Sequence, residues 1–97
     1  MLVYISGSIS GNNFNIVKRK FKKTQKKLEL EGHKVINPAK GRLTEDPREY
    51  VKYLLRDCDE ILACQAVYFL KDWKQSTGAN IEMLIAKKFN KKILYED

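Results

Sequence analysis

The sequence predicts an α/β protein in which helices cover both faces of a four-stranded parallel sheet, a three-layer α/β/α arrangement. Three observations predict this fold class. Short apolar segments alternate along the 97 residues with longer segments of helical periodicity. No unbroken apolar run exceeds five residues, so each run suits one strand. Strands that alternate with helices imply parallel pairing through right-handed crossovers, with both sheet faces covered.

The first strand, loop and helix are predicted from residues 2–32. Residues 2–6 are strand-like, and residues 7–11 form a loop of small residues. A helix is expected from about residue 13 to residue 31, and Gly32 is expected to end it in the C′ position. The apolar residues of this helix recur at steps of three, four and seven, which marks one face: Phe14, Val17, Phe21 and Leu28.

A second strand and a second helix follow. Residues 34–37 are strand-like, and Pro38 stops the strand because proline cannot donate to the sheet ladder. Residues 39–47 form a polar loop. Apolar residues at helical spacing then resume and predict the second helix: Val51, Leu54, Leu55, Cys58, Ile61 and Leu62.

The last third of the chain predicts a strand, a loop, a helix and a final strand. Residues 66–70 are the third strand, and residues 71–77 are a loop in which Ser76 or Thr77 can cap the next helix. Residues 92–95 are the fourth strand. The buried face of the third helix is expected to consist of its large apolar residues: Ile81, Leu84, Ile85 and Phe89. The resulting β-α-β-α-β-α-β order is typical of flavodoxin- or Rossmann-like sheets.

This length predicts a single domain over residues 1–97. In open parallel sheets, ligands bind beyond the carboxyl ends of the strands, near the change in strand order. The loops at those ends are residues 6–13, 37–49 and 71–78. We therefore expect any chemistry to lie there.

Composition narrows the function classes. Nineteen basic against twelve acidic residues give a net charge of +7, which suits an anionic partner such as a nucleotide. A hydrophobic content of 43% excludes intrinsic disorder. No segment has the length of a transmembrane helix, and the first residues read as a strand, so we expect a cytoplasmic location and no membrane partner. The two cysteines, Cys58 and Cys64, and the single His33 predict neither a metal site nor a disulfide framework.

The first loop has the composition of an anion-binding turn. Gly7 and Gly11 allow close approach of a ligand to the backbone, and Ser6, Ser8 and Ser10 add hydroxyl groups. The loop lacks both the GxGxxG and the GxxxxGK[ST] patterns, so neither a dinucleotide fold nor a P-loop ATPase is indicated. From composition alone, a tight strand–helix turn and a phosphate-binding loop are equally good interpretations.

Two carboxylates outside this loop can meet at the same sheet edge. Glu82 lies one turn into the third helix, where the helix dipole favours a negative charge. Asp57 lies beside the apolar stripe of the second helix, between Leu55 and Cys58. Glu82 alone is explained as a helix-start charge. Two carboxylates that meet across a cleft, however, are what cleavage of a glycosidic bond requires.

Four motifs in this order resemble the nucleoside 2-deoxyribosyltransferase superfamily, and most closely a short branch common in bacteriophages and their hosts. The motifs are residues 4–11 (YISGSISG), residues 35–38 (VINP), Asp57, and residues 73–82 (WKQSTGANIE). The first motif also resembles the opening of the 2′-deoxynucleoside 5′-monophosphate N-glycosidases. The resemblance covers nearly the whole chain.

The resemblance implies a reaction and its residues. Glu82 matches the nucleophile that attacks C1′ of the deoxyribose, Asp57 matches the acid that orients the sugar and assists proton transfer, and Tyr4 matches a tyrosine that positions the nucleophile. It also implies a homo-oligomer, no cofactor, and either hydrolysis or transfer to an acceptor base. Further residues are predicted to bind the substrate or its phosphate: Gly7, Ser8, Ile9, Ser10, Gly11, Asn37, Trp73, Ser76 and Gly78.

The sequence departs from this family at two positions. Ser10 stands where the hydrolases commonly carry arginine, which removes a strong phosphate contact. Gln65 stands where an acidic residue usually precedes the third strand. Trp73 has two equal interpretations, since it can stack on a base or anchor its loop.

Two alternatives stay open. A binding module of the same fold would hold a nucleotide without turning it over, as Ser10 and Gln65 suggest. The basic segment between Lys18 and Lys27 could instead bind nucleic acid, but it has no interleaved aromatic residue for stacking on bases. A solvated helix face is the commoner explanation of such a segment, so we expect a small-molecule partner rather than a nucleic acid.

Overall fold

The computed structural model describes residues 1–9, 11–40 and 47–97. It confirms the predicted α/β fold and the predicted order of elements. In the described residues, no helix is long and apolar enough to cross a membrane. The elements in chain order are β1 (Leu2–Ser6), α1 (Phe14–Leu30), β2 (Lys34–Ile36), α2 (Pro47–Ala63), β3 (Ala66–Phe69), the short 3-10 turn η1 (Trp73–Gln75), α3 (Thr77–Lys88) and β4 (Lys92–Tyr95).

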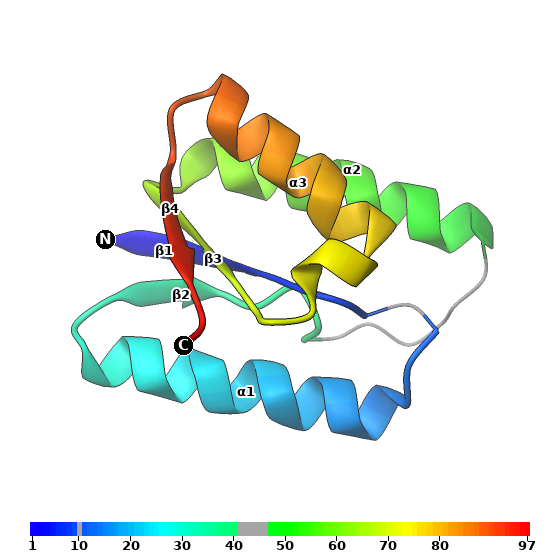
Figure 1. Cartoon of the computed structure of the whole chain (residues 1–97), viewed down its shortest axis with the longest axis horizontal. Coiled ribbons are helices and arrows are strands. Elements are labelled where there is room, and N and C mark those ends of the chain that lie inside the picture. The colour runs from blue at the N-terminus through cyan, green and yellow to red at the C-terminus, as the bar shows by residue number, and fades with distance from the viewer. Residues whose placement is uncertain (10, 41–46) are drawn as a thin grey trace.

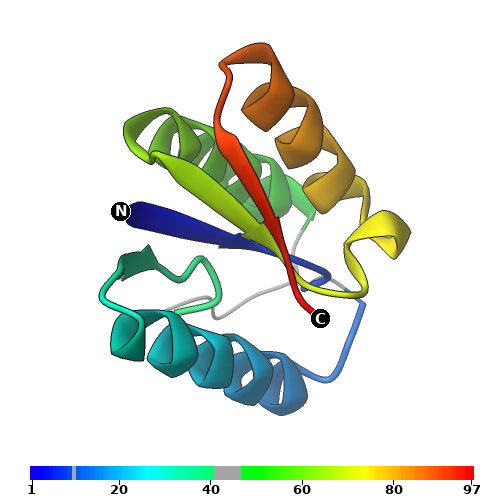
Figure 2. The same cartoon turned by 60° about the vertical axis from the view of Figure 1, so that its left-hand side comes forward.

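The four strands form one parallel sheet in the order β2-β1-β3-β4. Helix α1 covers one face, and α2 and α3 lie together on the other (Figures 1 and 2). The chain leaves β1 on the α1 side and leaves β3 on the α3 side. The change in direction therefore falls between β1 and β3, where sheets of this kind hold their ligands.

The alternation of side chains along β1 divides the core into two layers. Val3 and Ile5 pack with the buried face of α1, whereas Tyr4 belongs to the cluster beneath α2 and α3. Ser6, two residues after Tyr4, lies on the same side of the strand as Tyr4 because successive side chains alternate between faces. All four side chains are fully buried. The last residues of β1 thus present a tyrosine and a serine hydroxyl toward α3.

Local signals define the ends of α1. The Asn13 side chain caps the helix by accepting hydrogen bonds from the backbone N–H groups of Asn15 and Ile16. Gly32, just past the helix, adopts a φ of +92°, as expected for a glycine in the C′ position. The buried residues of α1 are Val17, Phe21, Thr24 and Leu28. Its remaining surface carries seven basic residues and one acidic residue.

The buried face predicted for the third helix is wrong. Leu84 and Phe89 are exposed, and Ile81 and Ile85 are only partly buried. The buried residues of α3 are instead Ala79, Glu82, Met83 and Ala86. The two alanines let the helix approach the sheet closely, and the side chain that this brings inward is a carboxylate.

Candidate functional site

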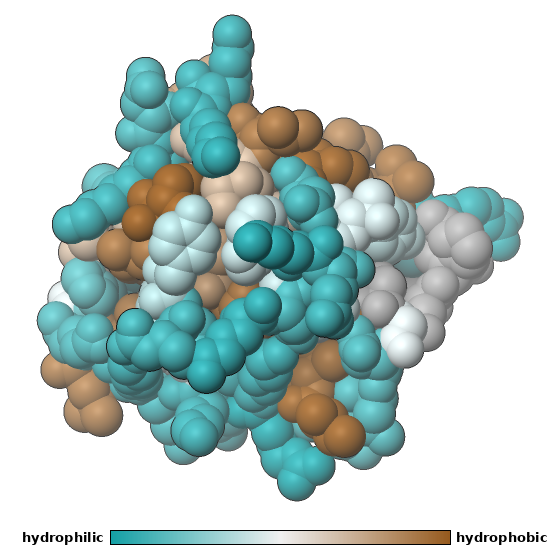
Figure 3. All heavy atoms as spheres, in the orientation of Figure 1, coloured by the Kyte–Doolittle hydropathy of each residue, from teal (hydrophilic) through white to brown (hydrophobic). Residues whose placement is uncertain are grey.

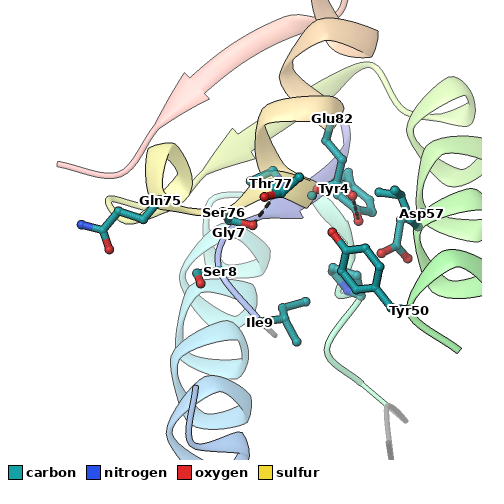
Figure 4. A pocket seen from close by; sticks show the side chains of 14 residues that line it. Tyr4, Gly7, Ser8, Ile9, Tyr50, Asp57, Gln75, Ser76, Thr77 and Glu82 are labelled. Atoms are coloured by element: carbon teal, nitrogen blue, oxygen red, sulfur yellow. Dashed lines mark hydrogen bonds between the residues drawn. The ribbon is translucent and has the colours of Figure 1, made fainter. Parts of the chain in front are cut away.

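A cavity of about 410 Å³ opens at the carboxyl ends of β1 and β3. Its walls come from the end of β1 and the loop after it, the turn after β2, the Tyr50–Asp57 part of α2 and the start of α3 (Figure 4). This is the place where the strand order changes. The lining residues are Tyr4, Gly7, Ser8, Ile9, Pro38, Tyr50, Leu54, Asp57, Gln75, Ser76, Thr77, Gly78, Ala79 and Glu82.

Glu82 is held by both of its carboxylate oxygens. The Tyr4 hydroxyl donates to Oε2 at 2.7 Å, and the Ser6 hydroxyl donates to Oε1 at 2.7 Å. The Glu82 residue is only 5% exposed. Two hydroxyl donors at these distances favour the ionised carboxylate and fix its orientation. A buried carboxylate held in this way on a cavity wall can act as a nucleophile.

The position of Glu82 follows from the way α3 begins. The Ser76 side chain caps the helix by accepting a hydrogen bond from the Ala79 N–H group at 3.1 Å, so that of the two predicted caps, Ser76 and Thr77, it is Ser76 that serves. Glu82 therefore lies in the second turn, on the side that faces β1. The positive end of the helix dipole adds to the preference for a negative charge at this position.

Asp57 reaches the same cavity from α2. It is 2% exposed, and Nη2 of Arg56 lies 3.3 Å from its Oδ1 atom. Figure 4 shows the Asp57 and Glu82 side chains on one side of the cavity, close to the Tyr50 ring. Burial raises the pKa of the Cys58 thiol on α2 above its ordinary value, and the negative charges of Glu82 and Asp57 add to this rise.

The first loop is held close to the end of β3. A side chain at Gly7 would place its Cβ atom 2.8 Å from the Leu70 side chain, so this position requires glycine. Ser8 and Ile9 continue the cavity wall. Gly11, with a φ of +80°, is exposed and lies outside the lining residues. Ser10 lies outside the residues that the structure describes.

Asn37 and Trp73 also lie outside the lining of this cavity. The Asn37 side chain accepts a hydrogen bond from the Ala39 N–H group at 3.0 Å and donates one to Gln25 at 3.1 Å. These contacts organise the turn after β2. Trp73 packs on Phe69 with ring centroids 5.3 Å apart, and it borders the core beneath α2 and α3. This packing favours the interpretation of Trp73 as a loop anchor.

Gln65 has a structural partner at the amino-terminal ends of the strands, away from the cavity. It precedes β3, and its Oε1 atom accepts the Leu2 N–H group at 2.6 Å at the start of β1. The cavity lies at the other ends of these strands. The absence of an acid at position 65 therefore carries no information about the cavity.

Several residues of the site were not predicted in their observed roles: some line the cavity, whereas Ser6 lies outside the lining and acts only as a hydrogen-bond donor to Glu82. Ser6 could have been found, because it lies two residues after Tyr4 and so shares its face of the strand. No sequence motif marks Tyr50 as a site residue. Its hydroxyl oxygen lies 3.3 Å from the place of a Cβ atom at Gly78. This contact arises because α2 approaches the start of α3, and no local sequence pattern predicts it.

Among the described residues, no cluster of three or more histidine, cysteine or acidic side chains could hold a metal ion.

The family model described as "Domain of unknown function (DUF4406)" matches residues 1–95 of the chain. No curated protein matches it significantly.

Proposed function

The chain belongs to this family of domains of unknown function, and from its cavity we propose that it breaks the N-glycosidic bond of a 2′-deoxynucleoside or its 5′-monophosphate. The observation that carries this proposal is the pair of buried carboxylates, Glu82 and Asp57, on the wall of one cavity. The hydroxyl groups that hold Glu82 and the resemblance of four sequence motifs support the same reaction. The volume of about 410 Å³ is within the range of small-ligand sites.

In the first step, an oxygen of Glu82 attacks C1′ of the deoxyribose. The bond between C1′ and the base nitrogen breaks, and its electron pair leaves with the base. Asp57, in its protonated form, supplies the proton that the departing base takes up. The product is a glycosyl ester on Glu82, which divides one difficult substitution into two easier ones.

In the second step, a water molecule attacks the same carbon and the ester bond breaks. Asp57, now ionised, accepts a proton from the water, and Glu82 returns to the carboxylate form. Over the cycle, Asp57 gives and regains one proton. If a second base attacks in place of water, the reaction is a transfer. Tyr4 and Ser6 act as positioning residues, because they touch the nucleophile rather than the reacting carbon.

The proposal includes two further features, the oligomeric state and the cellular location. The resemblance implies a homo-oligomer, and exposed leucines on α2 and α3, Leu55 and Leu84, support self-association through that side of the molecule. The proposed location is the cytoplasm, as the sequence analysis predicts.

The proposal is tested by release of free base. The protein is incubated with the four 2′-deoxynucleosides and, separately, with their 5′-monophosphates, and the products are separated by chromatography. Base should be released from at least one of the eight compounds. The Glu82→Ala variant should release none, whereas Glu29→Ala, which changes an exposed glutamate on α1, should match the wild type. Mass spectrometry of acid-quenched protein should detect the glycosyl ester.

Release of no base from any of the eight compounds by the wild-type protein would refute the proposal. If calorimetry then detected binding of one of them without turnover, the alternative of a nucleotide-binding module would take its place.

A further inference from the structure

A second cavity, of about 360 Å³, lies between α1 and the turn after β2. The described residues that line it are all different from those that line the cavity with Glu82 and Asp57. Strand β2 and the segment that follows it run beside α1 in both views of the chain (Figures 1 and 2). We call this second cavity the lysine groove, because its lining includes four lysines: Lys18, Lys22, Lys26 and Lys40.

Asn37 joins the two walls of the lysine groove. Its side chain donates a hydrogen bond to Oε1 of Gln25 on α1 at 3.1 Å and accepts the Ala39 N–H group at 3.0 Å. Its carbonyl oxygen accepts the Lys40 N–H group at 3.2 Å, which closes the turn. The turn thus brings Lys40 to the same groove as the three lysines of α1. In the described part of the chain, the side-chain amide nitrogen of Gln25 has no acceptor, so it can donate to a ligand in the groove.

The lysines of the groove lack acidic partners. Lys18, Lys22 and Lys26 recur every four residues, so they follow one side of α1 over about 12 Å. Within the residues that the structure describes, none of the four lysines forms an ion pair. Like charges at this spacing destabilise a helix, and a bound anion would relieve their repulsion. A solvated helix face accounts for lysines on α1, but it does not account for Lys40 and the Gln25 amide at the same groove.

A short chain of phosphates suits this groove better than a long polyanion. Lysine ammonium groups bind phosphates as point charges, and several in a row can hold consecutive phosphates. The row of lysines is followed by Glu29 and Glu31, so a nucleic acid that continued past this end of α1 would meet two carboxylates. The volume of the groove is within the range of small-ligand sites. We propose that the lysine groove binds an oligophosphate, either an inorganic chain such as tripolyphosphate or the triphosphate group of a nucleotide.

Calorimetry with tripolyphosphate at constant ionic strength tests the proposal. The wild-type protein should bind tripolyphosphate more tightly than orthophosphate, which reaches fewer of the lysines. The double variant Lys22→Gln with Lys26→Gln should weaken the binding of tripolyphosphate about tenfold or more, the scale of one lost charge-assisted hydrogen bond. The control, Arg19→Gln with Lys23→Gln, removes the same charge from residues of α1 that line a different hollow. It should change the affinity much less.

A second pair of variants shows which cavity is occupied. Gln25→Glu places a carboxylate among the lysines of the groove and keeps an oxygen that can accept from Asn37. This variant should lose detectable binding of tripolyphosphate. Gln75→Glu makes the same chemical change in the lining of the cavity with Glu82 and should leave the binding unchanged. Urea unfolding shows whether each variant is folded, and tripolyphosphate should stabilise the wild type but not Gln25→Glu.

A wild-type protein that does not bind tripolyphosphate would overturn the inference. Equal losses in the two double variants would also overturn it, because binding would then follow net charge alone. So would a loss in Gln75→Glu as large as that in Gln25→Glu. A DNA duplex that binds more tightly than tripolyphosphate at the same phosphate concentration, and loses affinity in both double variants, would assign α1 to nucleic acids instead.

Competition with ATP distinguishes the two sources of the phosphates. If ATP displaces bound tripolyphosphate at lower concentrations than orthophosphate-free tripolyphosphate itself requires, nucleotides are the preferred ligands. The opposite order indicates an inorganic chain, and both orders support the inference. None of these measurements uses base release, so the oligophosphate site and the proposed reaction stand or fall separately.

Discussion

At the scale of single residues, the site depends on an ionised carboxylate, that of Glu82, in the protein interior. An ionised carboxylate in the protein interior is costly unless hydrogen bonds replace its water. Glu82 receives such bonds from Tyr4 and Ser6. The same two groups fix the carboxylate in one orientation. Stability and reactivity are therefore coupled at this position.

Tyr4→Phe tests this coupling. The variant keeps the ring and removes the hydroxyl that donates to Oε2 of Glu82. We expect a loss of about 1–3 kcal/mol in the free energy of unfolding, measured by urea titration, because a buried acceptor loses its donor. Base release should fall as well. Tyr53→Phe, which changes a partly buried tyrosine outside the cavity lining, is the matched control. A Tyr4→Phe variant with wild-type stability and wild-type base release would show that the hydrogen bond to Glu82 contributes nothing.

Gly78 is constrained by the cavity rather than by its backbone. An alanine there would place its Cβ atom 3.3 Å from the Tyr50 hydroxyl oxygen, which is closer than side chains usually tolerate. Because alanine is the better helix former by about 1 kcal/mol, we expect Gly78→Ala to leave stability unchanged or slightly higher. Base release should fall, because Tyr50 must move. Adding Tyr50→Phe to the variant removes the oxygen and should restore part of the activity. A Gly78→Ala variant that releases base at the wild-type rate would show that the space between position 78 and Tyr50 is not needed for the reaction.

At the scale of elements, sequence reasoning succeeded where the cause is local. Gly32 and Ser76 mark helix ends through their own backbone and side-chain chemistry: Gly32 follows α1 as predicted, and Ser76 is the one of the two predicted caps that α3 uses. The buried face of α3 was predicted wrongly. Large apolar residues were expected inside, but the distance between a helix and its sheet decides which side chains fit. Alanines at positions 79 and 86 permit a close approach, and Leu84 is left outside.

The same distinction separates the site residues. The sequence predicts the carboxylates at positions 57 and 82, because acidic residues are few near the apolar faces of these helices and the order of elements brings both helices to the carboxyl ends of the strands. Both carboxylates line the cavity. Asn37 and Trp73 lie in the expected loops, but packing turns their side chains to Gln25 and to Phe69. Where a loop side chain points depends on neighbours that are distant in sequence. No local pattern encodes it.

The cap of α1 gives an element-scale prediction that is independent of the cavity. Asn13 accepts two backbone N–H groups at 3.0 and 3.2 Å. Asn13→Ala should lower the free energy of unfolding by about 0.5–2 kcal/mol in urea titration. Asn15→Ala, two residues later and exposed, has no cap to lose and should be neutral or slightly stabilising. Equal effects of the two substitutions would show that the Asn13 cap does not stabilise the helix.

At the scale of the whole molecule, α1 carries most of the basic charge of the helices, whereas more of the exposed large apolar side chains lie on α2 and α3 than on α1. Helix α1 carries seven basic residues against one acidic residue, whereas α2 carries three basic and four acidic residues. Two copies of the α1 side would repel each other. Figure 3 shows hydrophobic residues gathered along the upper side of the molecule, where α2 and α3 lie in Figure 1. Helix α2, whose charges nearly balance, thus lies on the side that carries more of the exposed large apolar residues.

This arrangement predicts that a second copy of the chain packs against α2 and α3. Leu55 is 66% exposed and Leu84 is 69% exposed, and burial of a leucine side chain is worth about 1.5–3 kcal/mol. Sedimentation of the wild-type protein should give a mass above that of one chain, and Leu55→Glu should reduce it to one chain. Leu30→Glu is the control, because Leu30 is 89% exposed but lies at the end of the basic helix. If Leu30→Glu dissociated the assembly and Leu55→Glu did not, the copies would meet through α1 despite its charge. A wild-type protein that sediments as a single chain at every concentration would leave the leucines of α2 and α3 as ordinary exposed surface.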